Sequence, residues 1–390
     1  MKTYSFNQLV IDKRTGLNPR RNFKLGSGEN HYVTIKEIHD GKIIITDKTE
    51  KIDDAALELI QKRSKIKKGD ILFASIGRIG ETAIVENDPK NWNVNESVFV
   101  FTVDQTKVLP AFFCFLLASP KNAEILKDKS TGSTFRSIKM GQLEKLSFDI
   151  PPIDEQTKII LALSGINDAI AKVQNAIFES DELIKSRFVK MFGDETKFPK
   201  EPLASNVSQM FIGPFGSDLK NDCFVPKEQG FCIVYEQRNA IKKTIDEPNR
   251  YVREDKYRKM IRFSVLPGDI IVSCRGTVGE TYVIPEKAPL GIMHPSIMKI
   301  RVKKDKYLPK FFDGLLQLFF KDHSDNNGSG VKMAITATAL GKESFIVPPL
   351  NVQKDFCSFE DKIYKLEKEM QREKDLLNEL LSLKMHQYFD

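Results

Sequence analysis

Hydrophobic and polar residues follow one another along this chain in an order that occurs twice. Each half opens with short apolar segments separated by Gly, Asn and Asp turns, which predicts β-strands. A short apolar helix is predicted after a Leu-Pro step, at 109–117 and again at 308–316. A loop rich in Gly and Ser follows (129–136 and 326–332), and then a strand that ends in Pro-Pro. The pattern predicts two mixed α/β domains built on one plan.

A long helix is predicted after each Pro-Pro step. Apolar residues at a spacing of three to four, sustained over about four heptads, are typical of a coiled coil, and the alternative is a surface helix on its own domain. We expect Asp154 and Asn351 to cap the helices. Paired antiparallel, helices of ~33 residues would form a bar ~50 Å long. The apolar positions are Ile159, Leu163, Ile166, Ile170, Val173, Ile177 and Ile184, and then Phe356, Phe359, Ile363, Leu366, Met370, Leu377 and Leu380.

The clearest repeat joins "GDILFASIGRIGETAIV" (69–85) with "GDIIVSCRGTVGETYVI" (268–284), which are identical at seven of seventeen positions. The glycines of this segment are expected to permit a tight turn, and Asp70 and Asp269 to stabilise it. A weaker correspondence aligns 31–43 with 231–243 from the first residue of each. The resulting organisation is a domain at 1–152, a helix at 153–193, a second domain at 194–349 and a C-terminal helix at 350–390.

The distribution of charge favours a polyanionic partner. The net charge is +7, and basic residues cluster at 13–24, 61–68 and 238–262, upstream of each Gly turn. The alternative for each cluster is a solvated surface. No apolar run approaches the ~20 residues that span a bilayer, and the N-terminus lacks a signal peptide. The five cysteines are scattered and form no CxxC pair, which fits reduced thiols. We therefore expect a cytoplasmic protein without a membrane partner.

No pattern of residues indicates a catalytic, cofactor-binding or metal site. "FDIPPID" (148–154) superficially resembles the Asn/Asp-Pro-Pro-aromatic signature of adenine methyltransferases, but Ile150 separates Asp149 from the prolines and no aromatic residue follows. No GxGxxG follows a strand, no GxxxxGK[ST] is present, and the five histidines are isolated. We expect the chain to bind no cofactor or metal and to carry out no catalysis.

The ordered, duplicated set of motifs resembles the specificity subunits of type I restriction-modification systems over essentially the whole chain. The resemblance also includes "GPFGSDLK" (213–220), with "RTGLNPRR" (14–21) as its looser counterpart. The residues that carry it are Gly69, Asp70, Gly77, Gly80, Pro151, Pro152 and Gln156, with Gly268, Asp269, Gly276, Gly279, Pro348, Pro349 and Gln353.

The resemblance implies an α+β fold with two similar target recognition domains of mixed α/β structure. They would be separated by two long helices that form an antiparallel coiled coil with an approximate internal two-fold. Each domain would read one half of a bipartite, asymmetric DNA target, across a gap set by the helices. The implied partners are double-stranded DNA, two methyltransferase subunits and restriction/translocase subunits, and S-adenosylmethionine, ATP and Mg²⁺ would be bound only by those partner subunits. Two alternatives stay open: a coiled-coil adaptor that does not bind DNA, and a self-contained DNA methyltransferase or nuclease.

Basic side chains near the expected groove-facing loops are the candidates for DNA contact, since Arg and Lys bind phosphates and read base edges. Ser133 and Ser329 are candidate phosphate contacts, with a solvated loop as the alternative. Arg78 and Arg275 lie in the duplicated Gly turn but out of register, because Arg78 follows Gly77 whereas Arg275 precedes Gly276, so they need not share a role. The candidates are Arg14, Arg20, Arg21, Lys24, Arg78 and Arg136 in the first domain, and Lys220, Arg238, Arg275 and Lys332 in the second.

Overall fold

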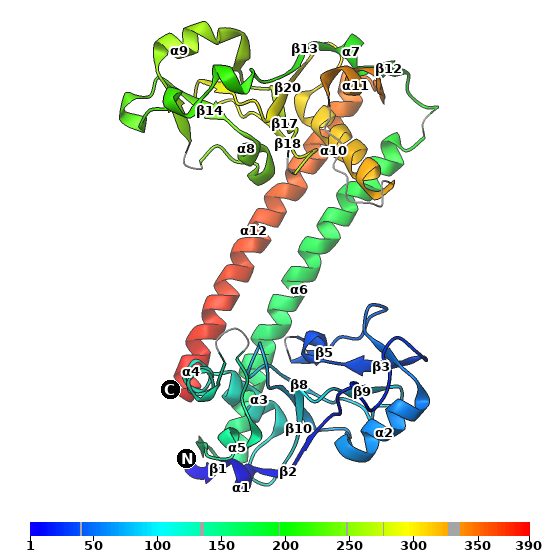
Figure 1. The fold of residues 1–390 in the computed structure, drawn as a ribbon, viewed down its shortest axis with the longest axis vertical. Coiled ribbons are helices and arrows are strands. Elements are labelled where there is room, and N and C mark those ends of the chain that lie inside the picture. The colour runs from blue at the N-terminus through cyan, green and yellow to red at the C-terminus, as the bar shows by residue number, and fades with distance from the viewer. Residues whose placement is uncertain (40, 133–135, 195, 247–248, 276, 327–335) are drawn as a thin grey trace. The chain divides into compact units, whose positions relative to one another are not determined.

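The chain divides into two compact units in a computed structural model that describes residues 1–390 apart from 40, 133–135, 195, 247–248, 276 and 327–335. Unit 1 comprises Met1–Ala176 and Met370–Asp390, and unit 2 comprises Ile177–Glu369. Two long helices, α6 (Ile153–Phe192) and α12 (Leu350–Phe389), each contribute a stretch to both units (Figure 1).

The globular part of unit 1 contains these elements: β1 (Lys2–Ser5), α1 (Phe6–Leu9), β2 (Val10–Thr15), β3 (Asn30–Val33), the 3₁₀ turn η1 (Ile35–Glu37), β4 (Ile38–His39), β5 (Lys42–Ile43), β6 (Lys51–Ile52), α2 (Asp54–Ser64), β7 (Ile71–Ala74), β8 (Thr82–Ile84), β9 (Trp92–Val94), β10 (Val98–Val103), α3 (Pro110–Ala118), α4 (Pro120–Lys129), α5 (Met140–Leu143) and β11 (Ser147–Ile150).

A four-stranded antiparallel sheet in the order β2-β10-β7-β8 forms the centre of unit 1. Because successive side chains of a strand point to opposite faces, β10 sends Phe99 and Phe101 to one side and Val98 and Val100 to the other. The phenylalanine side packs against α3 and against the start of α6 and the end of α12. The valine side packs against a second sheet, β6-β3-β9, in which β3 and β9 run parallel.

The globular part of unit 2 contains β12 (Lys200–Pro202), α7 (Leu203–Asn206), β13 (Val207–Ile212), β14 (Cys232–Tyr235), α8 (Gln237–Lys242), β15 (Arg250–Val252), α9 (Glu254–Lys259), β16 (Ser264–Val265), β17 (Ile270–Ser273), β18 (Thr281–Val283), β19 (Gly291–Met293), β20 (Ile297–Val302), α10 (Pro309–Asn326), α11 (Ala337–Lys342) and β21 (Ser344–Ile346).

Unit 2 repeats the strand order of unit 1. Its antiparallel sheet β13-β20-β17-β18 corresponds to β2-β10-β7-β8, and its second sheet, β15-β14-β19-β16, keeps the parallel pair as β14 and β19 and adds β16. The duplication read from the sequence is therefore a duplication of topology. With the two long helices packed together, this arrangement confirms the predicted fold class.

The weak correspondence between 31–43 and 231–243 joins the right elements but is wrong by two residues. Val33 lies opposite Val94 in the β3–β9 pair, and Tyr235 lies opposite Met293 in the β14–β19 pair. The same backbone hydrogen bond follows in both units, from Asn95 N to Val33 O and from His294 N to Tyr235 O, each 2.9 Å. Val33 therefore corresponds to Tyr235 and not to Ile233.

The helices α6 and α12 pack antiparallel within each unit. In unit 1, Ile159 near the start of α6 shares a core with Phe389 at the end of α12. In unit 2, the rings of Phe192 at the end of α6 and Phe356 near the start of α12 have centroids 5.6 Å apart. Two residues of the predicted stripe depart from this contact, since Leu366 and Leu380 are 52% and 40% exposed.

The capping prediction for the long helices is wrong. They begin at Ile153 and Leu350, so Asp154 and Asn351 already lie inside the first turn, where both are exposed. A residue caps a helix only from the position before its first turn. The Pro-Pro steps therefore lead directly into the helices.

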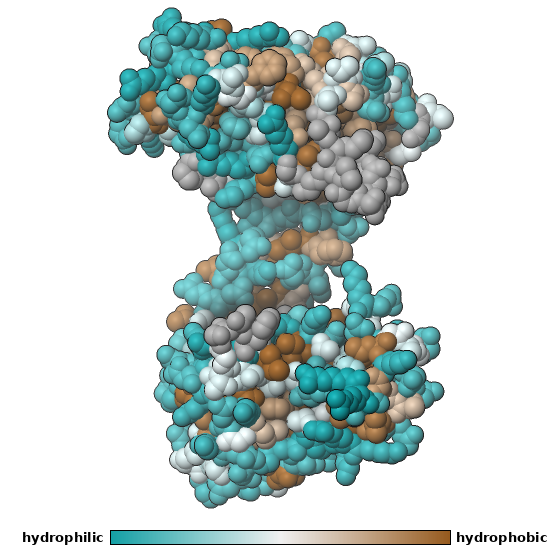
Figure 2. Space-filling view, in the orientation of Figure 1, coloured by the Kyte–Doolittle hydropathy of each residue, from teal (hydrophilic) through white to brown (hydrophobic). Residues whose placement is uncertain are grey.

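Polar residues cover most of the surface on view. Figure 2 shows that the visible face of each unit is mainly hydrophilic, with hydrophobic residues in scattered patches. Within the described ranges, none of the helices combines the length and the apolar character needed to cross a membrane.

Candidate nucleic-acid interface

The duplicated Gly-Asp turn of unit 1 is held by a buried ion pair. Asp70 is fully buried, and its Oδ2 accepts a hydrogen bond from the amide of Lys67 at 2.9 Å. The Arg14 guanidinium lies 3.0 Å from the same oxygen, and Thr102 donates to Oδ1 at 2.6 Å. The side chain of Arg14 is only 8% exposed. Arg14, one of the predicted DNA contacts, thus neutralises a carboxylate inside unit 1.

Unit 2 holds the equivalent carboxylate with a different arginine. Asp269 is also fully buried and accepts from the amide of Leu266 at 2.8 Å. Arg301 donates to its two oxygens from Nε at 2.5 Å and from Nη2 at 2.7 Å. The interpretation of both aspartates as turn-stabilising residues is confirmed by these contacts.

The glutamine of each Pro-Pro motif ties a long helix to the Leu-Pro step. The side chain of Gln156 accepts from Leu109 N at 2.8 Å and donates to Lys107 O at 2.8 Å and to Pro151 O at 2.9 Å. Gln353 makes the same three bonds in unit 2, to Leu308, Lys306 and Pro348. Both glutamines are fully buried. The sequence identified them as family markers but gave no sign of this structural role.

The second glycine of each turn is required by its backbone conformation. Gly80 has a φ of +94° and Gly279 a φ of +92°, a region that L-residues with a side chain rarely adopt. A Cβ at Gly80 would also lie 3.1 Å from Leu126 Cδ1, and one at Gly279 would lie 3.0 Å from Phe320 Cβ. The turn glycines that the structure describes therefore serve the fold, as predicted.

The other candidate contacts of unit 1 fall into two groups. Arg20, Arg21 and Lys24 are exposed in the loop between β2 and β3. Arg78 contacts other parts of unit 1: its Nη1 lies 2.9 Å from Glu81 and 3.0 Å from His39 Nδ1, and its Nη2 donates to Ile35 O at 2.5 Å. Arg136 is exposed and donates to Lys127 O at 3.2 Å.

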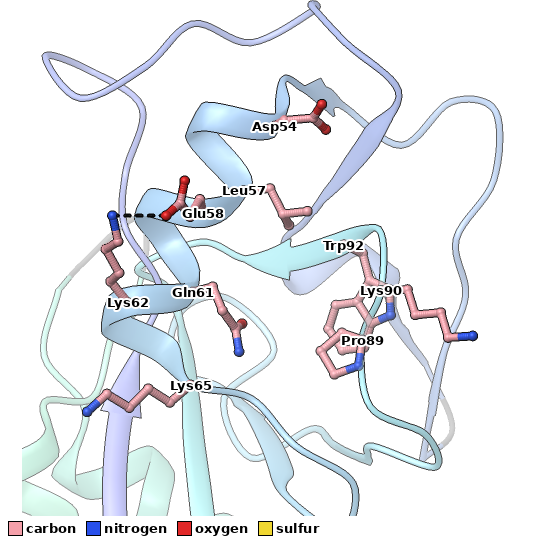
Figure 3. A pocket seen from close by; sticks show the side chains of 9 residues that line it. All are labelled: Asp54, Leu57, Glu58, Gln61, Lys62, Lys65, Pro89, Lys90 and Trp92. Atoms are coloured by element: carbon pink, nitrogen blue, oxygen red, sulfur yellow. Dashed lines mark ion pairs between the residues drawn. The ribbon is translucent and has the colours of Figure 1, made fainter.

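A groove beside the basic cluster 61–68 was not predicted. It encloses about 580 Å³ between α2 and the segment that leads into β9. Figure 3 shows Trp92 and Pro89 on one wall and Leu57 and Gln61 on the other. Lysines line it as well: Lys62, which pairs with Glu58 at 3.2 Å, Lys65 and Lys90. The only tryptophan of the chain therefore borders a basic groove.

In unit 2, Lys220 and Arg275 are exposed, while Arg238 is half-buried beside Glu236. Lys332, Ser133, Ser329 and Gly276, which the sequence analysis also singled out, lie outside the described residues.

Arg238 and Arg275 belong to a group of charged side chains that we call the Glu236 cluster: Glu236, Arg238, Arg250, Arg275 and His294. The Glu236 side chain is 11% exposed, and its Oε2 lies 2.7 Å from Arg238 Nη2. Its Oε1 lies 3.6 Å from Arg250 Nε and 4.0 Å from His294 Nε2. Arg250 also stacks over the Phe224 ring, 4.7 Å from the centroid. The helix that Glu236 precedes, α8, and the strand before it, β14, are labelled in Figure 1.

The Gly turn borders this cluster. Cys274, next to Arg275, donates its amide to Ser296 O at 2.9 Å, and the Ser296 hydroxyl lies 2.7 Å from His294 Nδ1. Burial lowers the pKa of His294 below its ordinary value; Glu236 opposes that shift, and the three arginines reinforce it. The imidazole is therefore mainly neutral at pH 7, so the cluster sets three guanidinium charges against one carboxylate.

Unit 1 has none of these side chains at the same positions. Thr34 corresponds to Glu236, since each follows the matched strand and starts a short helical segment with a capping box. Glu50 corresponds to Arg250 through the pairing of β3 with β6 and of β14 with β15. The full set in unit 1 is Thr34, Lys36, Glu50, Ile76 and Asn95, against Glu236, Arg238, Arg250, Arg275 and His294 in unit 2.

No three His, Cys, Asp or Glu residues come together in a metal-binding arrangement within the part of the chain that the structure describes.

A family model described as "Type I restriction modification DNA specificity domain" matches residues 7–177 and 242–379. The putative type I restriction enzyme MjaX specificity subunit of Methanocaldococcus jannaschii is 26% identical over 337 residues, which cover 82% of this chain and 77% of that protein. The type I restriction enzyme EcoBI specificity subunit of Escherichia coli is 28% identical over 167 residues, which cover 42% of this chain and 35% of that protein.

Two solved structures share the fold. The S subunit of a type I restriction-modification system from M. genitalium gives a TM-score of 0.56 at 14% identity, covering 98% of this chain and 94% of that chain. A chain from a study of complex assembly and conformational transition of the type I R-M system gives a TM-score of 0.61 at 15% identity, covering 100% of this chain and 97% of that chain.

Proposed function

Because the chain belongs to the type I restriction-modification DNA specificity family, we propose that its two recognition domains read the two halves of a bipartite, asymmetric target in double-stranded DNA. The domains are assigned to 1–152 and 194–349, and the helices at 153–193 and 350–390 act as spacers. As a specificity subunit the chain is not itself catalytic. We propose that it acts in the cytoplasm, where its proposed DNA target lies.

One observation carries the proposal of two different half-sites. The two units repeat the same strands, the same buried aspartate and the same glutamine, yet differ at all five positions of the Glu236 cluster. Base identity is read by side chains that reach base edges, whereas the backbone fold only positions them. Two domains that share one fold but present different polar side chains are therefore suited to reading two different DNA half-sites.

The exposed basic side chains are assigned to contacts with DNA phosphates. Arg20, Arg21 and Lys24 in unit 1, and Lys220 and Arg275 in unit 2, have side chains that make no ion pair with any described residue. Cations of this kind bind phosphates without regard to sequence and give the salt dependence of DNA binding. Arg136 and the undescribed Lys332 complete this set, while Arg14, Arg78 and Arg238 each already face a carboxylate of their own unit.

The chemistry is assigned to partner subunits. We propose two methyltransferase subunits that bind S-adenosylmethionine, and restriction/translocase subunits that use ATP and Mg²⁺. The solved chain with a TM-score of 0.61 comes from a study of the assembly of such a system, which supports a multisubunit complex.

The test is to co-express the chain with the methyltransferase subunit of its own system and to map methylated adenines. We expect one bipartite target whose two halves differ in sequence. A symmetric palindromic target would contradict the assignment of one half-site to each domain.

A further inference from the structure

The Glu236 cluster brings together residues that are distant in sequence. It combines the start of α8, β15, the Gly turn and the loop before β20. Glu236 itself is nearly buried, and a buried carboxylate is retained only where it is paired. Its partners Arg238 and Arg250 are 34% and 45% exposed, so each guanidinium is fixed at one end and still reaches solvent.

We propose that Glu236 is a positioning residue that sets the base specificity of unit 2 by holding Arg238 and Arg250 against the edge of a G·C base pair in the major groove. The proposal rests on the proposed function, because it requires that unit 2 reads one half-site. It adds the class of base that is read and the residues that read it.

The carboxylate favours a guanine edge over a phosphate as the partner of these arginines. A phosphate close to Arg238 would also approach Glu236, whose charge is little screened at 11% exposure, and the two anions would repel. The O6 and N7 atoms of guanine are neutral acceptors that a guanidinium can contact with two donors at once. A carboxylate that orients an arginine therefore suits base reading better than backbone binding.

Arg275 has a different role within the cluster. It is exposed in the Gly turn and makes no hydrogen bond or ion pair with the residues that the structure describes. Because it is exposed and has no partner among the described residues, we assign it to phosphate. The cluster thus contains two oriented arginines and one free arginine.

The test compares the wild-type chain with Glu236→Gln, each assembled with its methyltransferase subunits. Methylation rates are measured on DNA in which each G·C pair of both half-sites is replaced in turn by A·T, or its guanine by 7-deazaguanine, which lacks the N7 acceptor. We expect the methylation rate of the wild-type complex to fall about 5- to 150-fold when one G·C pair of the half-site read by unit 2 is replaced. Glu236→Gln should reduce that discrimination to less than about threefold and leave the other half-site unchanged.

Two further variants keep the proposal testable. Arg238→Lys retains the charge but not the two-donor geometry, so it should lose the same discrimination while the salt dependence of binding stays as in the wild type. Glu201→Gln is the matched control, since it removes another carboxylate of unit 2, which pairs with Lys306 at 3.0 Å outside the cluster. This variant should leave the discrimination at both half-sites unchanged.

Two results would overturn the proposal. One is a Glu236→Gln complex that keeps full discrimination at every G·C pair. The other is a uniform loss of methylation on all targets from Glu236→Gln and Arg238→Lys together with a shallower salt slope, which would assign the arginines to phosphate. A symmetric target in the wild-type complex would instead reject the proposed function itself, so the two failures are distinguishable.

Discussion

Arg301 donates two hydrogen bonds, from Nε and Nη2, to the two carboxylate oxygens of the fully buried Asp269. In unit 1 the arginine comes from the neighbouring strand: Arg14 on β2 contacts Asp70, and Thr102 occupies the position of Arg301 on β10. The two strands lie side by side in both sheets, so either can place a guanidinium over the Gly-Asp turn. The buried pair is common to both units, although the residue that supplies its positive charge is not.

Removal of the arginine should destabilise unit 2. We expect Arg301→Met to lower the free energy of unfolding by about 3–5 kcal/mol, because Asp269 would be left charged and buried without its partner. Chemical denaturation of the full chain measures this change. The double variant Asp269→Asn with Arg301→Met should lose less than Arg301→Met alone. Equal stability of Arg301→Met and the wild type would show that the pair contributes nothing.

The position of the arginine should be transferable between strands. Phe211 in unit 2 stands at the position of Arg14, so Arg14→Phe with Thr102→Arg rebuilds the unit 2 arrangement in unit 1. We expect Arg14→Phe alone to lower the free energy of unfolding by about 3–5 kcal/mol, and the addition of Thr102→Arg to restore at least about half of that loss. Unfolding of the single and double variants gives the coupling directly. If Thr102→Arg lowers the free energy of unfolding as much in the Arg14→Phe background as it does in the wild type, the two positions are not interchangeable.

The buried glutamines should tolerate neither an apolar nor an acidic replacement. Gln353→Met leaves Leu308 N, Lys306 O and Pro348 O without their side-chain partner. We expect this to lower the free energy of unfolding by about 2–4 kcal/mol. Gln353→Glu should cost more at pH 7, because a carboxylate would face two carbonyl oxygens. Thermal unfolding at pH 7 and pH 5 provides the measurement. Protonation of the carboxylate that Gln353→Glu introduces restores one hydrogen-bond donor, so the difference in unfolding temperature between the two variants should be smaller at pH 5.

A second glutamine of α12 provides the control for these variants. Gln371 is exposed, and among the described residues its side chain donates to Asp375 alone, one turn along the same helix, at 2.9 Å. Gln371→Met should therefore have little effect on the unfolding temperature. A loss from Gln353→Met no larger than that from Gln371→Met would show that the buried bonds do not stabilise unit 2.

The sequence predicted those features that depend on local pattern. Spacing of apolar residues identified the two long helices, and the identity of glycine at Gly80 and Gly279 identified the turns, because both depend on near neighbours in the chain. The role of Arg14 depended instead on strand register: it reaches Asp70 only because β2 pairs with β10, and β10 with β7. Charge and position in a basic cluster therefore do not reveal that Arg14 is paired with Asp70 inside the unit.

The Glu236 cluster was only partly predictable for the same reason. Arg238 and Arg275 were identified as candidates by their charge and position, but Glu236, Arg250 and His294 were missed. The alignment of 31–43 with 231–243 is wrong by two residues, so it places Thr34 opposite Val234 and not opposite Glu236. The sequence did hold one signal, since the basic stretch 238–262 includes Arg250.

Lys299 should make the stability of unit 2 depend on pH. Its side chain is buried at 1% exposure, where its Nζ donates to Ser264 O at 2.7 Å and lies 4.7 Å from the centre of the Phe211 ring. The pKa of Lys299 is lowered from 10.5 to about 8, mainly by burial; the Asp269 carboxylate opposes the shift and the Arg301 guanidinium adds to it. The same position of unit 1 is Val100, so the scaffold accepts an apolar residue here.

The direction of the pH dependence follows from these pKa values. Between about pH 8 and 10.5 the unfolded chain binds a proton at Lys299 that the folded chain does not, so this group's contribution to stability rises with pH in that window and is least favourable below pH 8. We expect Lys299→Met to be more stable than the wild type at pH 7 by about 1–2 kcal/mol, and the difference to shrink by pH 9.5. Urea unfolding of both proteins at the two pH values measures it, with the exposed Lys303→Met as the control that shows no such change. A difference between Lys299→Met and the wild type that is the same at both pH values would mean that Lys299 keeps its ordinary pKa in the folded protein.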